Sequence, residues 1–159
     1  MIRIILIALI SFATANASAQ RLRTTFNNDF SQWTWDGSSF RTIFKNDWDS
    51  WKFEDYSIKT DFSNDWDSWR IGNNVRVKTV FVNDWDGWEV RGYGKIIRVS
   101  TTFIDDFERW SISGDADGSM KTIFSNNFGT WDIDIEGELE EDLKIAITFI
   151  AVFTSFRRN

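Results

Sequence analysis

The chain contains no cysteine, no histidine and no proline among its 159 residues. Without cysteine it forms no disulfide, has no catalytic thiol and takes no cysteine-linked lipid, so its stability must come from its core. Without histidine it lacks the commonest general base and the commonest transition-metal ligand. These absences exclude thiol enzymes, disulfide scaffolds and histidine-based metal sites.

Basic residues are also few, since 18 Lys and Arg stand against 24 Asp and Glu, giving a net charge of −6. Nucleic acids and anionic membrane surfaces bind clustered Lys and Arg. We therefore expect no nucleic-acid partner. Aromatic residues are plentiful instead, with ten Trp, fifteen Phe and two Tyr, so the aromatic positions are the first candidates for both core and binding site.

Residues 1–19 predict a cleaved signal peptide. Arg3 gives a positive start, residues 4–13 form an apolar run, and residues 17–19 (Ala-Ser-Ala) match a small-residue cleavage site. The alternative is a retained anchor, but the apolar run is shorter than the ~20 residues that a spanning helix needs. We expect cleavage after Ala19 and export to the periplasm or the exterior. Loss of Arg3 leaves 17 basic against 24 acidic residues, a net charge of −7.

Six copies of one aromatic unit occupy residues 24–133, and the stretch FKNDWDSW at 44–51 is typical of them. Each copy has a threonine, an anchor phenylalanine two residues later, and a tryptophan seven residues after that. The threonines are Thr24, Thr42, Thr60, Thr79, Thr101 and Thr122; the anchor phenylalanines are Phe26, Phe44, Phe62, Phe81, Phe103 and Phe124; the repeat tryptophans are Trp33, Trp51, Trp69, Trp88, Trp110 and Trp131. Self-similarity at this period indicates a repeat architecture.

Each unit predicts a β-hairpin, because polar and apolar residues alternate on both sides of the Asn-Asp cluster. Folding the third unit about residues 65–66 places Phe62 opposite Trp69 on the core face. It also places Asp61 opposite Arg70 on the outer face, as an attractive cross-strand pair. Truncating Phe62 or Trp69 to alanine is then expected to cost ~3–5 kcal/mol.

Together the units predict a mainly β domain over residues 20–136, an antiparallel up-and-down sheet of six hairpins with about 12 short strands, open or barrel-like. The Asn-Asp turns are expected at one rim and the mostly glycine-containing connections at the other. Strands of five or six residues are shorter than the ~9–11 of an outer-membrane barrel. We therefore expect a soluble sheet that is not transmembrane.

Residues 137–159 predict a C-terminal helix that belongs to the same domain. Acidic residues at 137–142 precede an apolar run at 143–156 and a basic end, an order that suits the helix dipole. The apolar stripe of this helix is Leu139, Leu143, Ile147, Ile150 and Phe153. The β-branched content leaves a buried strand as the alternative. We expect the helix to pack on the aromatic face of the sheet, which is too large an apolar patch to stay exposed.

A second aromatic recurs four residues after each anchor phenylalanine. These turn aromatics are Phe30, Trp48, Trp66, Trp85, Phe107 and Phe128. An exposed row of such rings stacks on sugars, which predicts a glycan site. The alternative, favoured because buried aromatics dominate the energetics of small sheets, is that each ring covers the end of the core. Tryptophan in the three middle units fits either a central groove or atypical terminal repeats.

The acidic turns give a weak prediction of calcium binding. The carboxylates concerned are Asp47, Asp49, Asp65, Asp67, Asp84 and Asp86. Calcium takes six to eight oxygen ligands, and no complete calcium loop is present. Asn and Asp are also ordinary turn residues. We therefore expect no cofactor, with calcium as a minor alternative.

No catalytic constellation stands apart from the repeat, so we expect the protein not to be an enzyme. The favoured hypothesis is an exported, non-catalytic repeat protein that binds a glycan, cell-wall or protein partner at the cell envelope. The alternative is a purely structural or assembly protein of the envelope or extracellular matrix. In repeat length and aromatic content the units resemble the choline-binding repeats of cell-wall proteins. Their motif residues differ, however, so the resemblance implies no residue roles here.

Overall fold

The structure is a computed structural model that describes residues 19–158, and residues 1–18 of the predicted signal peptide lie outside the described residues. The described chain forms twelve strands followed by one helix. The elements are β1 (Gln20–Phe26), β2 (Asp29–Trp35), β3 (Ser38–Thr42), β4 (Ser50–Phe53), β5 (Tyr56–Thr60), β6 (Ser68–Ile71), β7 (Val75–Phe81), β8 (Asp84–Gly92), β9 (Lys95–Thr101), β10 (Arg109–Gly114), β11 (Asp117–Phe124), β12 (Asn127–Glu136) and α1 (Glu141–Arg158).

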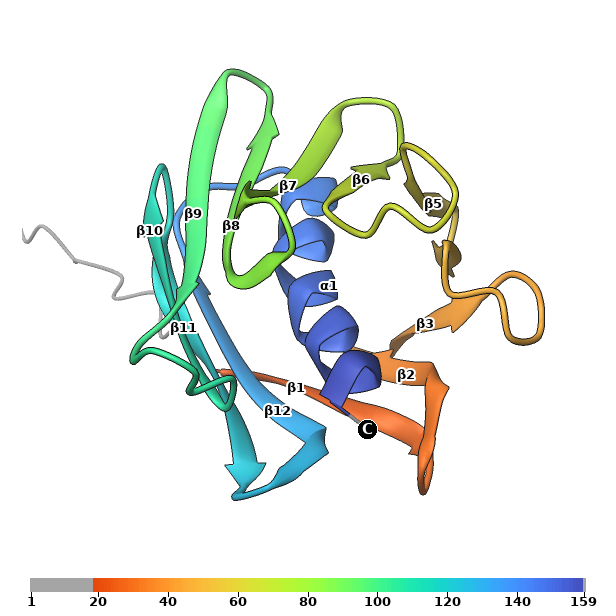
Figure 1. The fold of residues 1–159 in the computed structure, drawn as a ribbon. Helices are drawn as coiled ribbons and strands as arrows, with labels where there is room; N and C mark the ends of the chain where they lie inside the picture. The colour runs from red at the N-terminus through yellow and green to blue at the C-terminus, as the bar shows by residue number, and fades with distance from the viewer. Residues whose placement is uncertain (1–18, 159) are drawn as a thin grey trace, which may run out of the picture.

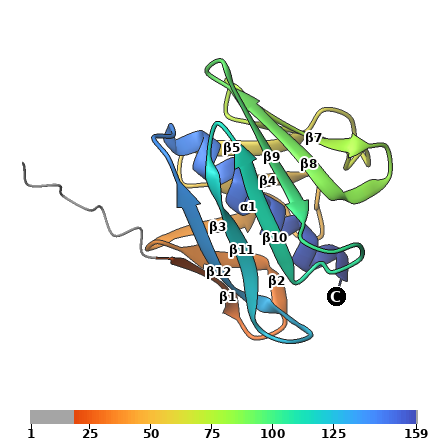
Figure 2. The same ribbon diagram turned by 90° about the vertical axis from the view of Figure 1, so that its left-hand side faces the viewer.

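The strands form a closed antiparallel barrel of up-and-down topology (Figures 1 and 2). Each strand pairs with its neighbours in sequence, and β1 pairs with β12 to close the cylinder. The predicted mainly β sheet of six hairpins is confirmed, and of its open and barrel-like forms the barrel is the one observed. All twelve described strands have partners on both sides, so assembly through free sheet edges is not open to them.

The two ends of the barrel differ as the repeat predicts. All six Asn-Asp turns, which join β1 to β2, β3 to β4 and so on, lie at one end, hereafter the turn rim. The connections between units lie at the other end. The connection between β4 and β5 has no glycine, and there a two-residue turn places Glu54 in the left-handed region at φ 47° between the paired Phe53 and Tyr56.

The predicted hairpin register is wrong by two residues. In every unit the repeat tryptophan pairs with the threonine and not with the anchor phenylalanine, as Trp69 does with Thr60. The turn is longer than residues 65–66, because the backbone N–H of Asp65 bonds the carbonyl of Phe62 at 3.1 Å. The predicted Asp61–Arg70 ion pair does form, at 2.7 Å, although Lys59 is the residue directly opposite Arg70.

As a result the anchor phenylalanines point away from the core. Their exposed fractions are Phe26 59%, Phe44 66%, Phe62 73%, Phe81 70%, Phe103 60% and Phe124 61%. In three units a β-bulge lies between the threonine and the phenylalanine, and in the other three the strand ends at the threonine. At each bulge three residues of the tryptophan strand stand opposite one residue of the threonine strand, so the phenylalanine pairs at the turn, beyond the tryptophan, as Phe26 does with Asp29. The phenylalanine that alternation assigns to the core therefore lies outside.

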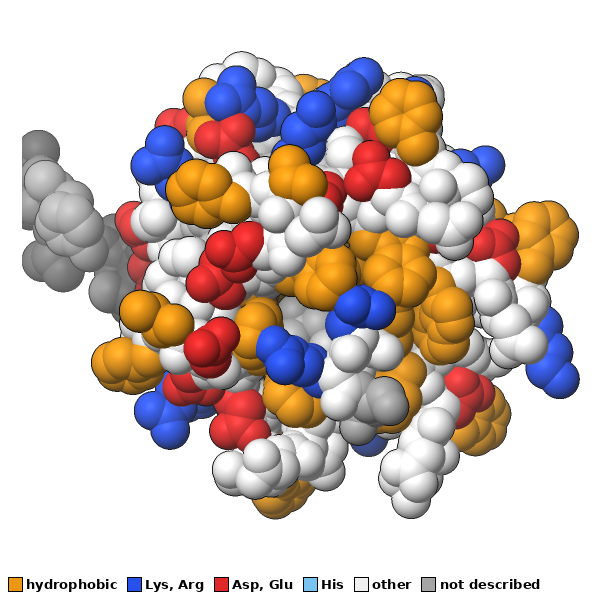
Figure 3. Space-filling view, viewed as in Figure 1, with side chains coloured by type: hydrophobic (Ala, Val, Ile, Leu, Met, Phe, Trp, Pro, Cys, Tyr) orange, Lys and Arg blue, Asp and Glu red, His pale blue; other side chains and the backbone are white. Residues whose placement is uncertain are grey.

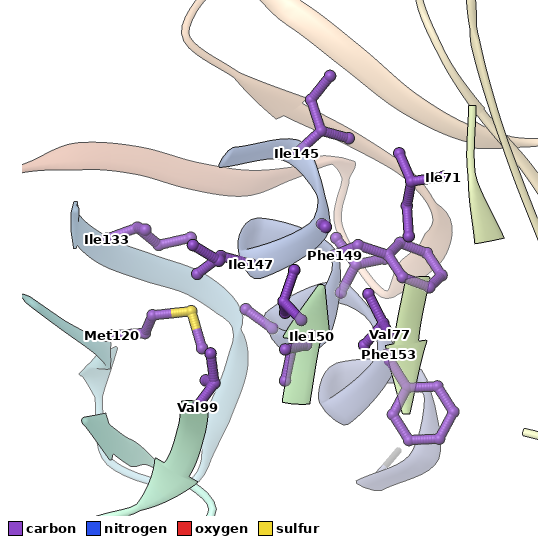
Figure 4. Packing of buried hydrophobic residues seen from close by; sticks show 14 of the residues in the cluster. Ile71, Val77, Val99, Met120, Ile133, Ile145, Ile147, Phe149, Ile150 and Phe153 are labelled. Carbon is purple, nitrogen blue, oxygen red and sulfur yellow. The ribbon is translucent and has the colours of Figure 1, made fainter. Parts of the chain in front are cut away.

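The helix fills the barrel. The prediction of a helix rather than a strand is confirmed, and α1 begins with Glu141 and Asp142 and ends with Arg157 and Arg158, as the helix dipole favours. Figure 1 shows α1 running through the ring of strands, and Figure 4 shows Ile147, Phe149 and Phe153 among side chains of the surrounding strands. No helix within residues 19–158 is long and apolar enough to cross a membrane.

Burial on α1 is not confined to the predicted stripe. Of the stripe residues Leu143, Ile147, Ile150 and Phe153 are buried, but so are all other residues from Ile145 to Ser155. The lumen explains this, because a helix enclosed by a barrel meets protein on every side. All six repeat tryptophans, at most 1% exposed, form the facing wall.

Candidate functional site

Each Asn-Asp turn is built in the same way. The first residue of the pair has a left-handed backbone in all six turns, with φ between 55° and 62°, which Asn and Asp tolerate better than other side chains. The next carboxylate or amide accepts a hydrogen bond from the backbone two residues later, as Asp47 does from Asp49 at 3.0 Å and Asp65 from Asp67 at 3.2 Å. The spacing that recurs in all six units thus follows from the geometry of the turns.

The repeat tryptophans hold the turns onto the core. In each unit the indole Nε1 donates to the backbone carbonyl of the turn aromatic three residues earlier, at 2.8–3.1 Å, as Trp69 does to Trp66. A buried indole N–H needs such an acceptor. The bond fixes the position of the turn aromatic relative to the barrel wall.

A third repeated position links one turn to the next. Asp49 accepts hydrogen bonds from the backbone N–H of Asn64 at 2.9 Å and from the indole Nε1 of Trp66 at 2.6 Å. The equivalent Asp67 accepts from the following turn in the same way. In the fifth turn Glu108 takes this role and accepts from the sixth. We call these three residues the bridging acids and each gap between neighbouring turns a seam.

The seam between the fourth and fifth turns has a different charge balance. There Asp105 occupies the position that is asparagine in the other turns, and Asp86 occupies that of a bridging acid. Burial raises the pKa of Asp86, and a hydrogen bond with Asp84 and the charges of Asp84 and Asp105 raise it further. At neutral pH the fourth seam therefore contributes less to the stability of the fold than the seams that have a single bridging acid.

The six turn aromatics surround the end of α1 and are half-buried. Phe156 stacks on Trp48, with ring centroids 4.9 Å apart. The guanidinium of Arg157 lies 4.7 Å from the ring of Trp66 and 4.2 Å from that of Trp85. Figure 3 shows hydrophobic side chains near the middle of this face with basic side chains beside them. The helix end therefore covers part of the predicted aromatic row.

The predicted ligand-binding residues consequently fall into two groups. Trp66, Trp85 and Phe107 lie beneath Arg157 or Arg158. The other three, Phe30, Trp48 and Phe128, border hollows at the seams of the first turn. The row is thus divided between three rings that lie beneath the arginines and three rings that border hollows.

The first seam, between the first and second turns, holds a hollow of about 370 Å³. Its walls include Phe30, Trp48 and Phe156, and its polar lining is Asn28, Asp29, Ser31, Thr42, Lys45 and Asn46. Position 31 corresponds to the bridging acids, and serine does not reach the next turn, because its hydroxyl donates to Asp29 at 2.5 Å. A smaller hollow of about 260 Å³ lies at the sixth seam, where Gly129 occupies the bridging position.

The predicted calcium ligands lie in these turns as hydrogen-bond acceptors. Asp47, Asp65 and Asp84 bond the backbone of their own turns, and Asp49 and Asp67 bridge the seams. Within residues 19–158 no group of three or more His, Cys, Asp or Glu side chains is arranged to hold a metal. Calcium binding stays a prediction that the geometry does not favour.

Ser31, Lys45, Asn46 and Phe156 are site residues that sequence reasoning missed. The departure of Ser31 and Gly129 from the acidic consensus of the repeat was the available indication of the hollows. Comparisons with protein-family models, with curated proteins and with solved structures find no match for this chain.

Proposed function

We propose that the protein is a non-catalytic binding protein that takes a glycan at the first seam. The hollow there is the observation that carries the proposal. Its volume of about 370 Å³ falls in the 300–1,000 Å³ range of small-molecule sites, which combine apolar walls with a few polar groups. The rings of Phe30 and Trp48 offer faces on which a sugar stacks, and Asn28 and Asn46 offer amides for its hydroxyls.

The position of Arg157 at the turn rim supports the first seam as the binding site. Because Arg157 lies over Trp66 and Trp85, stacking a sugar on those rings requires moving the helix end. Phe30 borders the open hollow and needs no such movement, whereas Phe156 of the helix end already covers one face of Trp48. The polar groups that line the hollow are two amides, two hydroxyls, one ammonium and the single carboxylate of Asp29; one carboxylate does not make the acid and base pair of a glycosidase, so the lining suits recognition more than bond cleavage. The predicted export is consistent with a glycan ligand.

The proposal is tested by screening the purified protein against immobilised neutral and acidic oligosaccharides. Phe30→Ala should weaken binding at least about tenfold, the value of roughly 1.4 kcal/mol of lost stacking. Phe107→Ala is a matched control, because each ring packs on its own repeat tryptophan at a similar distance, 5.8 and 6.1 Å. Absence of binding to every saccharide, or equal loss in both variants, contradicts the proposal.

A structural or assembly role is the second candidate, and the anchor phenylalanines favour it. Six phenylalanine rings that are 59–73% exposed surround one end of the barrel. So much exposed apolar surface is unusual unless it contacts another molecule. Self-association measured by sedimentation velocity, and its loss in a Phe62→Ser/Phe81→Ser variant, would support assembly through this ring. A monomer at all concentrations, with the variant unchanged, would exclude it.

A further inference from the structure

The bridging acids show what kind of group fits between two turns. At the second seam the carboxylate of Asp49 takes the backbone N–H of Asn64 and the indole N–H of Trp66. At the third seam Asp67 takes the equivalent backbone N–H and indole at 3.0 and 3.1 Å. The later turn of each seam thus presents a pair of donors spaced for one carboxylate.

The first seam presents the same donors to no carboxylate of the chain. The backbone N–H of Asn46 and the indole Nε1 of Trp48 are equivalent to those of Asn64 and Trp66. Within residues 19–158 neither has a hydrogen-bond acceptor. Both residues line the hollow, where Ser31 stands in place of a bridging acid.

Charge at the first seam also differs from that at the second. Lys45, which lines the hollow, occupies the position of Ser63 in the next turn, so one ammonium is added where one carboxylate is missing. The carboxylate of Asp29 also lies near the first seam. It does not prevent a second carboxylate from binding there, because its counterpart Asp47 lies beside the carboxylate of Asp49 at the second seam. The negative net charge of the chain acts weakly here, because exposed charges beyond about 8 Å are screened at physiological salt.

We propose that the first seam binds the carboxylate of a uronic acid, with Asn46 N–H, Trp48 Nε1–H and Lys45 as its donors. This inference rests on the proposed glycan function and names the class of sugar. The carboxylate takes the place that Asp49 fills at the second seam, while the sugar ring lies against Phe30 or Trp48. The sixth seam does not qualify, because the turn that follows Gly129 carries Phe30 and so offers no indole donor.

The test is a titration of the ¹⁵N-labelled protein followed by amide and indole NMR signals. The probes are sodium glucuronate, its uncharged methyl ester and glucose. We expect glucuronate to shift the Asn46 amide and the Trp48 indole and to bind about tenfold more tightly than the ester, since charged hydrogen bonds are stronger than neutral ones. Lys45→Ala should reduce that preference, and Lys52→Ala, on the barrel wall, should not.

The Ser31→Asp variant tests the geometry independently of any sugar. It recreates the bridging acid, so the Asn46 amide and Trp48 indole protons should shift downfield in the unliganded variant, and glucuronate should no longer move them. Ser31→Ala controls for loss of the hydroxyl and should still respond. Thermal unfolding of both variants establishes that they are folded.

The outcomes separate this inference from the function on which it rests. Glucuronate, ester and glucose binding equally well at the first seam would overturn the carboxylate assignment and leave glycan binding intact. Unchanged Asn46 and Trp48 signals in Ser31→Asp would overturn the assignment as well. A response to sodium acetate, added as a fourth probe, but to no saccharide would retain the carboxylate site and reject the glycan function.

Discussion

Replacing Trp69 with alanine should destabilise the protein severely, whereas replacing Phe62 with alanine should change stability little. Both residues belong to positions that recur in all six units, so repetition alone ranks them equally. The structure separates them, because the Trp69 side chain is 1% exposed and that of Phe62 is 73% exposed.

The size of the Trp69 effect follows from its surroundings. Its ring lies 4.9 Å from that of Phe149 and 5.9 Å from that of Phe153 on the enclosed helix, and its Nε1 donates to the carbonyl of Trp66 at 2.9 Å. Truncating a buried aromatic costs about 3–5 kcal/mol, and more if the cavity cannot collapse around it. Against a total stability of about 5–15 kcal/mol, this loss leaves the protein marginal. For Phe62 we expect at most about 0.5 kcal/mol, as for most surface positions.

Urea unfolding followed by far-ultraviolet circular dichroism measures both variants, with Trp69→Phe as an intermediate case that keeps most of the apolar volume. The order of midpoints should be Phe62→Ala close to the parent, then Trp69→Phe, then Trp69→Ala. A Phe62→Ala variant as unstable as Trp69→Ala would refute the observed register and restore a Phe62–Trp69 pair.

Three further changes test the turns and the helix. Asp49→Ala should cost about 1 kcal/mol in urea unfolding, because the half-buried indole of Trp66 and the exposed backbone N–H of Asn64 lose their shared acceptor. The pKa of Asp86 is raised, so the folded state holds that proton more tightly than the unfolded chain does. Ionisation of Asp86 therefore lowers the free energy of unfolding as the pH rises above the ordinary carboxyl pKa. Asp86→Asn should raise the free energy of unfolding by less than about 1 kcal/mol at pH 7 and leave it unchanged at pH 3. Thr148→Val should stabilise by about 1 kcal/mol, because this buried hydroxyl has no partner within residues 19–158, whereas Thr154→Val removes a 2.8 Å bond to the helix backbone and should not stabilise.

Much of the fold follows from periodicity in the sequence. The six Thr and Trp positions were sufficient to predict hairpins, an up-and-down order and two chemically different rims, all of which the structure confirms. The helix followed from acidic residues before the apolar run and Arg157 and Arg158 after it. These features depend on local preferences that short stretches of sequence carry by themselves.

The register error arose next to the turns, where regular strand pairing shifts or ends. Alternation through Thr79 and Val80 assigns Phe81 to the core opposite Trp88, but the pairing shifts there by two residues, so Trp88 lies opposite Thr79 and Phe81 lies opposite Asp84 at the turn. Bulges have no strong composition of their own. The helix stripe was similarly incomplete, because a helix inside a closed barrel is buried all round, and closure is set by long-range pairing of β1 with β12.

The candidate site was predictable only in outline. The turn aromatics were identified as a group, but which rings are covered depends on where α1 ends, and Arg157 over Trp66 and Trp85 is a contact between segments far apart in sequence. The hollow at the first seam is lined by Ser31, whose importance follows only from the bridging role of its equivalents Asp49 and Asp67.

At the turn rim, the residues that build the scaffold differ from the residues that we propose bind a ligand. The repeat tryptophans are already packed in the lumen, and the carboxylates and amides that follow the left-handed residues already accept hydrogen bonds within their own turns, so these recurring positions have few groups left for a ligand. Unused hydrogen-bond donors arise where one unit departs from the rest, as the first unit does at Ser31. The neighbouring turn still presents its two donors there, but the chain provides no bridging carboxylate, and Lys45 adds a positive charge. Function in this barrel is therefore best sought at the exceptions to the repeat, and the Ser31→Asp variant, which removes one exception, is the most direct way to test that reasoning.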